Sequence, residues 1–265
     1  MRAASLAGLS VVSLLTGLTA CTGERAGELE ETAVTARSVP GSCQIIFGGE
    51  VCTWGTMVGD QITEFGATMP MATVQNAPAE AEMAFPPVSV GVVPLPEAVQ
   101  AATGFNHLGV NWEPHGHPPG PFMVPHFDLH FYTVDPEIVE AIDCEDVTKP
   151  AMVPAGYTLP DVEIPELGTL VGLCVPRMGM HAILEAEVDG TEPFGASLIV
   201  GYDRQQVIFA EPMIAQSMLL EARTFTLEMP AAAAGPDVRW PRSFQAVYDE
   251  AAQSYRLVFS ELASN

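Results

Sequence analysis

Histidines gather in one short part of the chain. Five of the six lie within residues 107–130, where a random scatter would place only about half a histidine. Imidazole is the commonest transition-metal ligand in proteins, and it titrates near neutral pH. The cluster therefore indicates metal binding, and this segment is the first candidate for a functional site.

The end of the segment alternates polar and apolar residues in a way that predicts a β-strand. Residues two apart on a strand share a face, so we expect His126, Asp128 and His130 to point in one direction. The residues between them, Phe127, Leu129 and Phe131, would then point into a core. One face of this strand is predicted to be chemical and the other to be packing.

His115 and His117 are also two apart, and Gly116 between them would let both rings approach one point. We therefore predict a Zn²⁺, Mn²⁺ or Fe²⁺ site with four ligands, His115, His117, His126 and His130. Asp128 is either a further ligand or the acceptor that fixes a histidine tautomer. The alternative is that these histidines hydrogen-bond to the backbone of a proline-rich turn. His107 lies outside both pairs, and we assign it a structural role.

A second, distant histidine motif extends this pattern. The order of Gly109, His115 and His117, followed later by Gly179-Met180-His181, resembles the two-motif layout of cupins. The glutamate that cupins carry soon after the histidine pair is absent, because prolines occupy that region. Glu211 is a candidate to replace it in space, so His181 and Glu211 are further ligand or second-layer candidates.

Four ordered motifs resemble a family of exported, often lipid-anchored bacterial proteins that carry a domain of unknown function. The motifs are Pro114-His115-Gly116-His117-Pro118, the stretch from Pro125 to Tyr132, Met178-Gly179-Met180-His181, and Tyr202 with Glu211-Pro212-Met213. The resemblance runs from about Gly49 to the final hairpin. It implies a compact, cupin-like β-rich fold whose histidines face a pocket, and it implies no activity. Ala182 stands where the family pattern has an aromatic residue.

The amino terminus has the features of an export signal. Residues 1–20 begin with one positive charge and continue as a short apolar segment, which predicts a signal peptide. The last three of these residues and the next one, Leu18-Thr19-Ala20-Cys21, resemble a bacterial lipobox. We therefore predict lipidation of Cys21 and anchoring at the cell envelope, on the periplasmic face or the cell surface. The alternative is an ordinary signal peptide with an incidental cysteine. Residues 21–42 are polar and unpatterned, which predicts a flexible tether.

Export would make the other four cysteines a disulfide framework. Four cysteines allow three pairings. Gly48-Gly49 between two β-branched runs predicts a hairpin that joins Cys43 to Cys52, which leaves Cys144 with Cys174.

The remaining pattern predicts one mainly β domain over residues 43–265. Short apolar runs separated by glycine or proline predict strands at 107–110, 126–134, 167–175, 198–202 and 207–210, and a hairpin of 244–248 with 255–259. Two short helices are expected, at 96–102 and 135–142. This pattern predicts a β-sandwich or open barrel, and the resemblance described above implies that it is cupin-like.

The charge balance limits the partners. With 33 acidic against 10 basic residues the net charge is −23, which excludes nucleic acid as a partner and leaves the Cys21 anchor as the contact with a bilayer. A small-molecule ligand and self-association stay open. The leading hypothesis is a lipid-anchored metal-binding protein, with enzymatic activity undecided. The alternatives are a non-enzymatic envelope module for binding or self-assembly with a structural histidine network, and metal sequestration.

Overall fold

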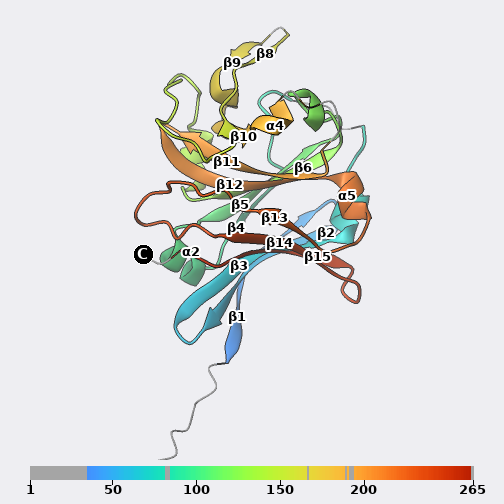
Figure 1. The fold of residues 1–265 in the computed structure, drawn as a ribbon. Helices are drawn as coiled ribbons and strands as arrows, with labels where there is room; N and C mark the ends of the chain where they lie inside the picture. Colours follow the sequence, from blue (N-terminus) through green and yellow to red (C-terminus); the bar gives the residue numbers. More distant parts are fainter. Residues whose placement is uncertain (1–34, 81–83, 166, 189, 191–193, 264–265) are drawn as a thin grey trace, which may run out of the picture. The chain divides into compact units, whose positions relative to one another are not determined.

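Two antiparallel β-sheets lie face to face in the protein (Figure 1). The structure is a computed structural model, and it describes residues 35–80, 84–165, 167–188, 190 and 194–263. The expected mainly β, sandwich-like fold is confirmed, and the strands in these ranges form no closed barrel. The predicted signal peptide and Cys21 lie outside the described residues.

The first sheet has six strands and is built from both ends of the domain. Its order is β1 (Ala36–Ile46), β2 (Gly49–Val58), β3 (Gln61–Pro70), β15 (Ser254–Ser260), β14 (Ser243–Asp249) and β13 (Phe225–Glu228). The predicted carboxy-terminal hairpin is confirmed, since Phe244 pairs with Phe259 and Tyr248 with Tyr255. This hairpin joins the sheet through pairing of β15 with β3.

The second sheet has seven strands and carries the histidine segment at its centre. Its order is β4 (Gly91–Pro94), β5 (His107–Glu113), β6 (His126–Tyr132), β12 (Gln206–Ala215), β11 (Ala196–Asp203), β10 (Met180–Leu184) and β7 (Tyr157–Thr158). A separate ribbon of β8 (Val162–Ile164) and β9 (Gly168–Leu170) lies on the side of this sheet away from the first sheet (Figure 1).

The main core fills the space between the two sheets. Phe65, Phe105, Phe131 and Phe259 are completely buried there, with ring centroids 4.8 to 6.3 Å apart. Burial of each such ring stabilises the fold by roughly 1.5–3 kcal/mol. Phe131 belongs to β6, so its contacts with Phe65 and Phe259 fix the face of β6 that points into this core.

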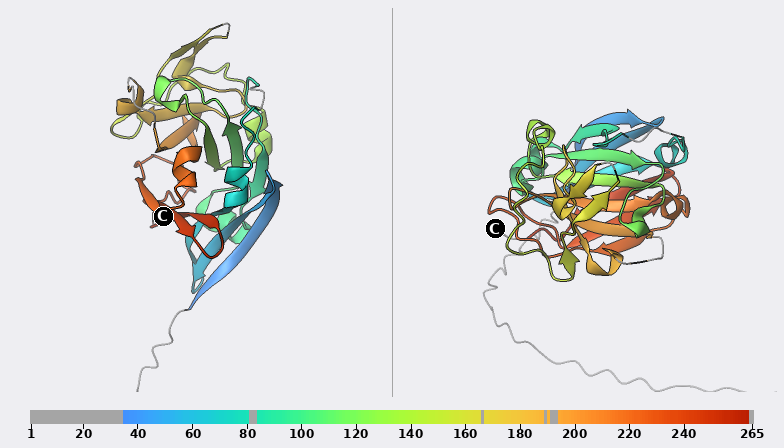
Figure 2. Two further views of the ribbon diagram at one scale, coloured as in Figure 1. Left: turned by 90° about the vertical axis from the view of Figure 1, so that its right-hand side faces the viewer. Right: turned by 90° about the horizontal axis from the view of Figure 1, so that it is seen from above.

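A smaller apolar cluster covers the outer face of the seven-stranded sheet. It combines sheet residues with residues of the covering loops, namely Phe122, Tyr132, Val139, Ile142, Leu173, Ile183, Ile199, Ile208, Phe209 and Met213. The covering segments lie over this sheet in two further views (Figure 2). Both faces are therefore buried at the centre of the sheet, where β5 and β6 have no exposed residue.

Three details differ from the expectation. The described residues contain five helices instead of two: α1 (Met71–Gln75), α2 (Glu97–Thr103), α3 (Pro136–Glu140), α4 (Glu185–Val188) and α5 (Gln216–Leu220). The unexpected three are only one turn or so long, which is too short to show a helical period. The expected strand 167–175 ends at Leu170, since Gly172 has a left-handed φ of 62° inside a 3₁₀ turn.

The predicted tether is also shorter. Residues 36–42 belong to β1, where they pair with β2 from Ala36 opposite Val58 onward. The same hairpin places Cys43 opposite Cys52, and these two form one disulfide, while Cys144 and Cys174 form the other. Both pairings are those expected from the sequence. No helix within the described ranges is long and apolar enough to cross a membrane.

Candidate metal centre

Strand β6 divides its side chains between two environments. Phe127, Leu129 and Phe131 belong to the core between the sheets, as the alternation predicted. His126, Asp128 and His130 point to the outer face and are buried to 96% or more. The covering loops, rather than the sandwich core, enclose these polar groups.

Strand pairing brings further polar residues to the same face. Glu113 of β5 lies opposite His126, and Asn111 opposite Asp128. On the other side, β12 pairs so that Met213 lies opposite Asp128 and Ala210 opposite Phe131, which places Glu211 opposite His130.

The first set of converging donors, here called the His130 group, is His130, His181 and Glu211. One oxygen, Oε2 of Glu211, lies 3.6 Å from His130 Nε2 and 3.9 Å from His181 Nε2. All three residues are buried, and they come from three strands, β6, β10 and β12. His130 was a predicted ligand, and His181 and Glu211 were the further candidates.

The second set, here called the His117 group, is His117, His126 and Asp128. His126 Nε2 lies 3.1 Å from Asp128 Oδ1, and His117 Nε2 lies 4.0 Å from Asp128 Oδ2. The His117 side chain is 31% exposed, whereas the His126 and Asp128 side chains are almost fully buried. In each group the ligand atoms lie within 4.8 Å of one another.

The structure does not bring His115 to either group. Gly116 has a φ of 68°, and a Cβ there would lie 2.0 Å from the carbonyl oxygen of Phe122. The chain turns at this glycine, so the two flanking rings do not share a face as they would on a strand. His117 points inward and His115 is exposed. The four predicted histidines therefore do not form one centre.

His107 also lies outside both groups, where the sequence placed it. Its ring stacks on Tyr132 with centroids 4.9 Å apart, and Nδ1 lies 3.1 Å from Asn106 Oδ1. Burial lowers the pKa of the His107 imidazole to about 4, so it is neutral at pH 7.

Hydrogen bonds to backbone carbonyls orient three of the imidazoles. His117 Nδ1 lies 2.9 Å from the oxygen of Pro118, His126 Nδ1 2.7 Å from that of Val124, and His181 Nδ1 3.0 Å from that of Leu173. A carbonyl can only accept, so each Nδ1 carries the proton, and each Nε2 of a neutral ring presents a lone pair. This is the arrangement that fixes histidine ligands in metal sites.

Several buried polar atoms of the two groups lack a hydrogen-bond partner among the described residues. The buried atoms in this state are His126 Nε2, Asp128 Oδ1, both ring nitrogens of His130 and Glu211 Oε2. Burying an unsatisfied polar atom costs roughly 1–3 kcal/mol, and more for a charged one. One nitrogen of the neutral His130 ring carries a proton, and the other four atoms can each offer a lone pair, so this sheet face presents unpaired acceptors that suit a cation.

The pKa shifts of the titratable side chains differ between the His130 group and the His117 group. Burial lowers the pKa of His130 to about 3 and that of His181 to about 4, so both are neutral. Burial, together with repulsion from Asp128, raises the pKa of the Glu211 carboxyl. Burial also opposes the charged forms of His126 and Asp128, but their mutual attraction outweighs it, raising the pKa of His126 and lowering that of Asp128.

One cavity joins the groups. It encloses about 220 Å³ and is lined by Glu113, His117, Asp128, His181 and Glu211, with apolar walls that include Phe85, Phe122, Leu170, Leu173 and Met178. Burial, together with repulsion from Asp128, raises the pKa of Glu113 to about 8. Glu113 was not predicted from the sequence, although it stands two residues before His115.

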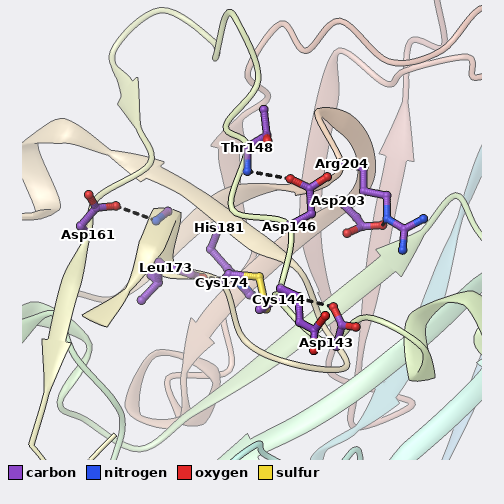
Figure 3. Close-up of a disulfide and its surroundings, with 12 residues drawn as sticks. Asp143, Cys144, Asp146, Thr148, Asp161, Leu173, Cys174, His181, Asp203 and Arg204 are labelled. Atoms are coloured by element: carbon purple, nitrogen blue, oxygen red, sulfur yellow. Dashed lines mark hydrogen bonds and ion pairs between the residues drawn. A yellow bond between two sulfur atoms is a disulfide. The ribbon is translucent and has the colours of Figure 1, made fainter. Parts of the chain in front are cut away.

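The Cys144–Cys174 disulfide holds the loop that closes over His181. Leu173, whose carbonyl oxygen contacts His181 Nδ1, is the neighbour of Cys174 (Figure 3). In the same loop, the backbone N–H of Gly172 donates to Asp161 Oδ1 at 2.8 Å. The orientation of one candidate ligand thus depends on a loop that is fixed covalently.

The donor separations suit a tetrahedral ion. With bonds of about 2.0–2.1 Å to nitrogen and oxygen, the edges of a tetrahedron are about 3.3–3.4 Å. The nitrogen–oxygen separations in the two groups are 3.1 to 4.0 Å, and all ligand atoms of a group lie within 4.8 Å of one another. Three protein ligands leave one position open, as in catalytic zinc sites.

Comparison with family models, curated proteins and solved structures finds no match, so function must be inferred from this geometry.

Proposed function

We propose that the protein binds a divalent transition-metal ion, Zn²⁺, Mn²⁺ or Fe²⁺, at the His130 group. The observation that carries the proposal is the contact of two neutral imidazole nitrogens with one buried carboxylate oxygen that has no hydrogen-bond partner among the described residues. A bound ion would satisfy all three atoms, and it would hold Glu211 in its charged form.

The open coordination position would face the cavity, whose walls are mostly apolar. A metal ion there can polarise an oxygen of a small ligand or lower the pKa of a bound water. We therefore propose Lewis-acid or redox chemistry on a small, largely apolar molecule as the activity.

The proposed setting is outside the cytoplasm, with the chain anchored through Cys21. The two disulfides fit an oxidising compartment. The lipobox-like segment 18–21 supports the anchor.

Elemental analysis of the mature protein, expressed without a histidine tag, tests the metal proposal. We expect at least one equivalent of metal, which Glu211→Gln should lower steeply because a neutral amide replaces the carboxylate. His115→Ala is the matched control, since this exposed histidine lies outside both groups, and it should keep the metal.

The alternatives predict other results. A wild-type protein that binds no metal, even when zinc is added, would support a structural histidine network in a non-enzymatic module. Sub-stoichiometric metal that exchanges freely and is unaffected by Glu211→Gln would support sequestration.

A further inference from the structure

We infer that the cavity binds a second divalent cation, at His117, His126 and Asp128. This inference rests on the proposed function, because the second ion would lie beside the one proposed at the His130 group. The two positions share strand β6, which supplies Asp128 to one and His130 to the other.

The geometry of the His117 group supports a cation by itself. Asp128 offers a different oxygen to each histidine, Oδ1 to His126 at 3.1 Å and Oδ2 to His117 at 4.0 Å. With Nδ1 of both rings hydrogen-bonded to backbone oxygens, both Nε2 atoms are directed toward this carboxylate. Two imidazole nitrogens and one carboxylate oxygen are a suitable ligand set for Zn²⁺, Mn²⁺ or Fe²⁺, and a bound ion would take the place of any proton on His126 Nε2.

A proton on His126 explains only part of this arrangement. It would neutralise the charge of Asp128, but His126 Nε2 and Asp128 Oδ1 have no hydrogen bond of good geometry among the described residues. It would also leave His117 Nε2 4.0 Å from the carboxylate, which is too far for a direct hydrogen bond. A metal ion about 2 Å from each donor would satisfy all three residues.

The surroundings limit how this group can move. Phe194 packs edge-on against His126 with centroids 5.3 Å apart, and Phe122 packs in the same way against His117 at 6.1 Å. Phe122 and Phe194 also contact each other at 5.0 Å. These rings enclose the group on its loop side, while His117, which is partly exposed, leaves a route for an ion to enter.

Zinc titration of the chelator-treated protein tests the inference, with bound metal measured by elemental analysis after gel filtration. We expect two equivalents in the wild type, one in His117→Ala and one in Glu211→Gln, and none in the double variant. His117 lies in a loop, and circular dichroism would verify folding. Asp128→Asn, which keeps the side-chain shape, should also bind one equivalent.

His115→Ala is again the control and should bind two equivalents. One equivalent in the wild type that is lost in Glu211→Gln and kept in His117→Ala would overturn the second position and leave the proposed function standing. One equivalent that is lost in His117→Ala and kept in Glu211→Gln would overturn the proposed location instead. No bound zinc in the wild type would overturn both.

Discussion

At the scale of single residues, a proton on Nδ1 of an imidazole leaves Nε2 with the lone pair that can bind a metal ion. Three backbone carbonyls hold protons on the Nδ1 atoms of His117, His126 and His181, so their Nε2 atoms are left as donors to a cation. The alternation in 126–131 predicted which side chains share a face. It could not predict tautomers, because the carbonyls come from loops.

The same limit explains the error at His115. Spacing of two places residues on one face only where the backbone is extended, and the positive φ of Gly116 breaks this rule. Glu113 was missed for the opposite reason. It continues the strand from His107, and its partner His126 becomes apparent only once β5 and β6 are paired.

The titration of His107 gives a prediction that does not depend on metal. Its pKa is about 4 in the folded protein and about 6.5 when unfolded, so between these values only the unfolded chain takes up the proton. Stability should therefore fall as pH falls from 6.5 to 4. In His107→Gln this dependence should be weaker, although stability at pH 7 drops by about 1 kcal/mol from loss of stacking on Tyr132.

Urea unfolding at pH 7, 6 and 5, with a chelator present, measures this difference. Parallel pH dependences in wild type and variant would contradict the prediction. The metal content of His107→Gln should equal that of the wild type, since this residue belongs to neither group.

At the scale of elements, close packing between strands positions the His130 group. Gly201 of β11 lies opposite His181, and a Cβ there would lie 1.9 Å from the ring of Phe209. That ring packs against both His130 and His181, with centroids 4.9 and 5.1 Å away. His181 and Glu211 were suggested by motif resemblance and not by local spacing, because only long-range strand pairing brings them together.

Gly201→Ala should displace the Phe209 ring and the two histidines beside it. We expect a loss of roughly 1–3 kcal/mol in the free energy of unfolding, together with weaker zinc binding. Gly235→Ala is the control, since a Cβ there would meet no atom within 4 Å. Equal zinc affinity in the Gly201 variant and the wild type would show that this contact does not position the ligands.

The two disulfides allow a matched comparison of their roles. On the chain-entropy model they stabilise the fold by about 2.5 and 3.5 kcal/mol, for separations of 9 and 30 residues. Replacing Cys144 and Cys174 by alanine should also weaken zinc binding about 10–100-fold, because the Leu173 carbonyl is no longer held. Replacing Cys43 and Cys52 should lower the melting temperature and leave zinc affinity unchanged. Isothermal titration calorimetry would separate these outcomes, and equal affinities would refute the role of the loop.

At the scale of the whole molecule, composition and pattern predicted most of the architecture. Short β-branched runs and turn residues specified a mainly β domain, and the strongest alternations became β6 and the β14–β15 hairpin. The order of strands in each sheet could not be predicted, because contacts such as that of β3 with β15 join the two ends of the domain. The outer layer was missed because its loops have no period.

The anchoring proposal can be tested on the intact chain. Cys21→Ser removes the only sulfur that the lipobox-like segment offers for acylation, so the protein should move from the membrane pellet to the supernatant after cell fractionation. Cys43→Ser, which leaves this segment intact, serves as the control. Equal membrane partitioning of wild type and Cys21→Ser would refute the anchor.

The bond between Cys144 and Cys174 also implies an order of assembly. Cytoplasmic thiols are kept reduced, so an exported chain would acquire this bond, and with it the final orientation of His181, only after translocation. The first ion to meet the completed ligand set would then come from the external supply rather than from the metal-buffered cell interior. Copper binds nitrogen and oxygen donors more tightly than zinc, manganese or iron do. The ion recovered from native protein would therefore report which metals that compartment contains, as well as what the ligands prefer.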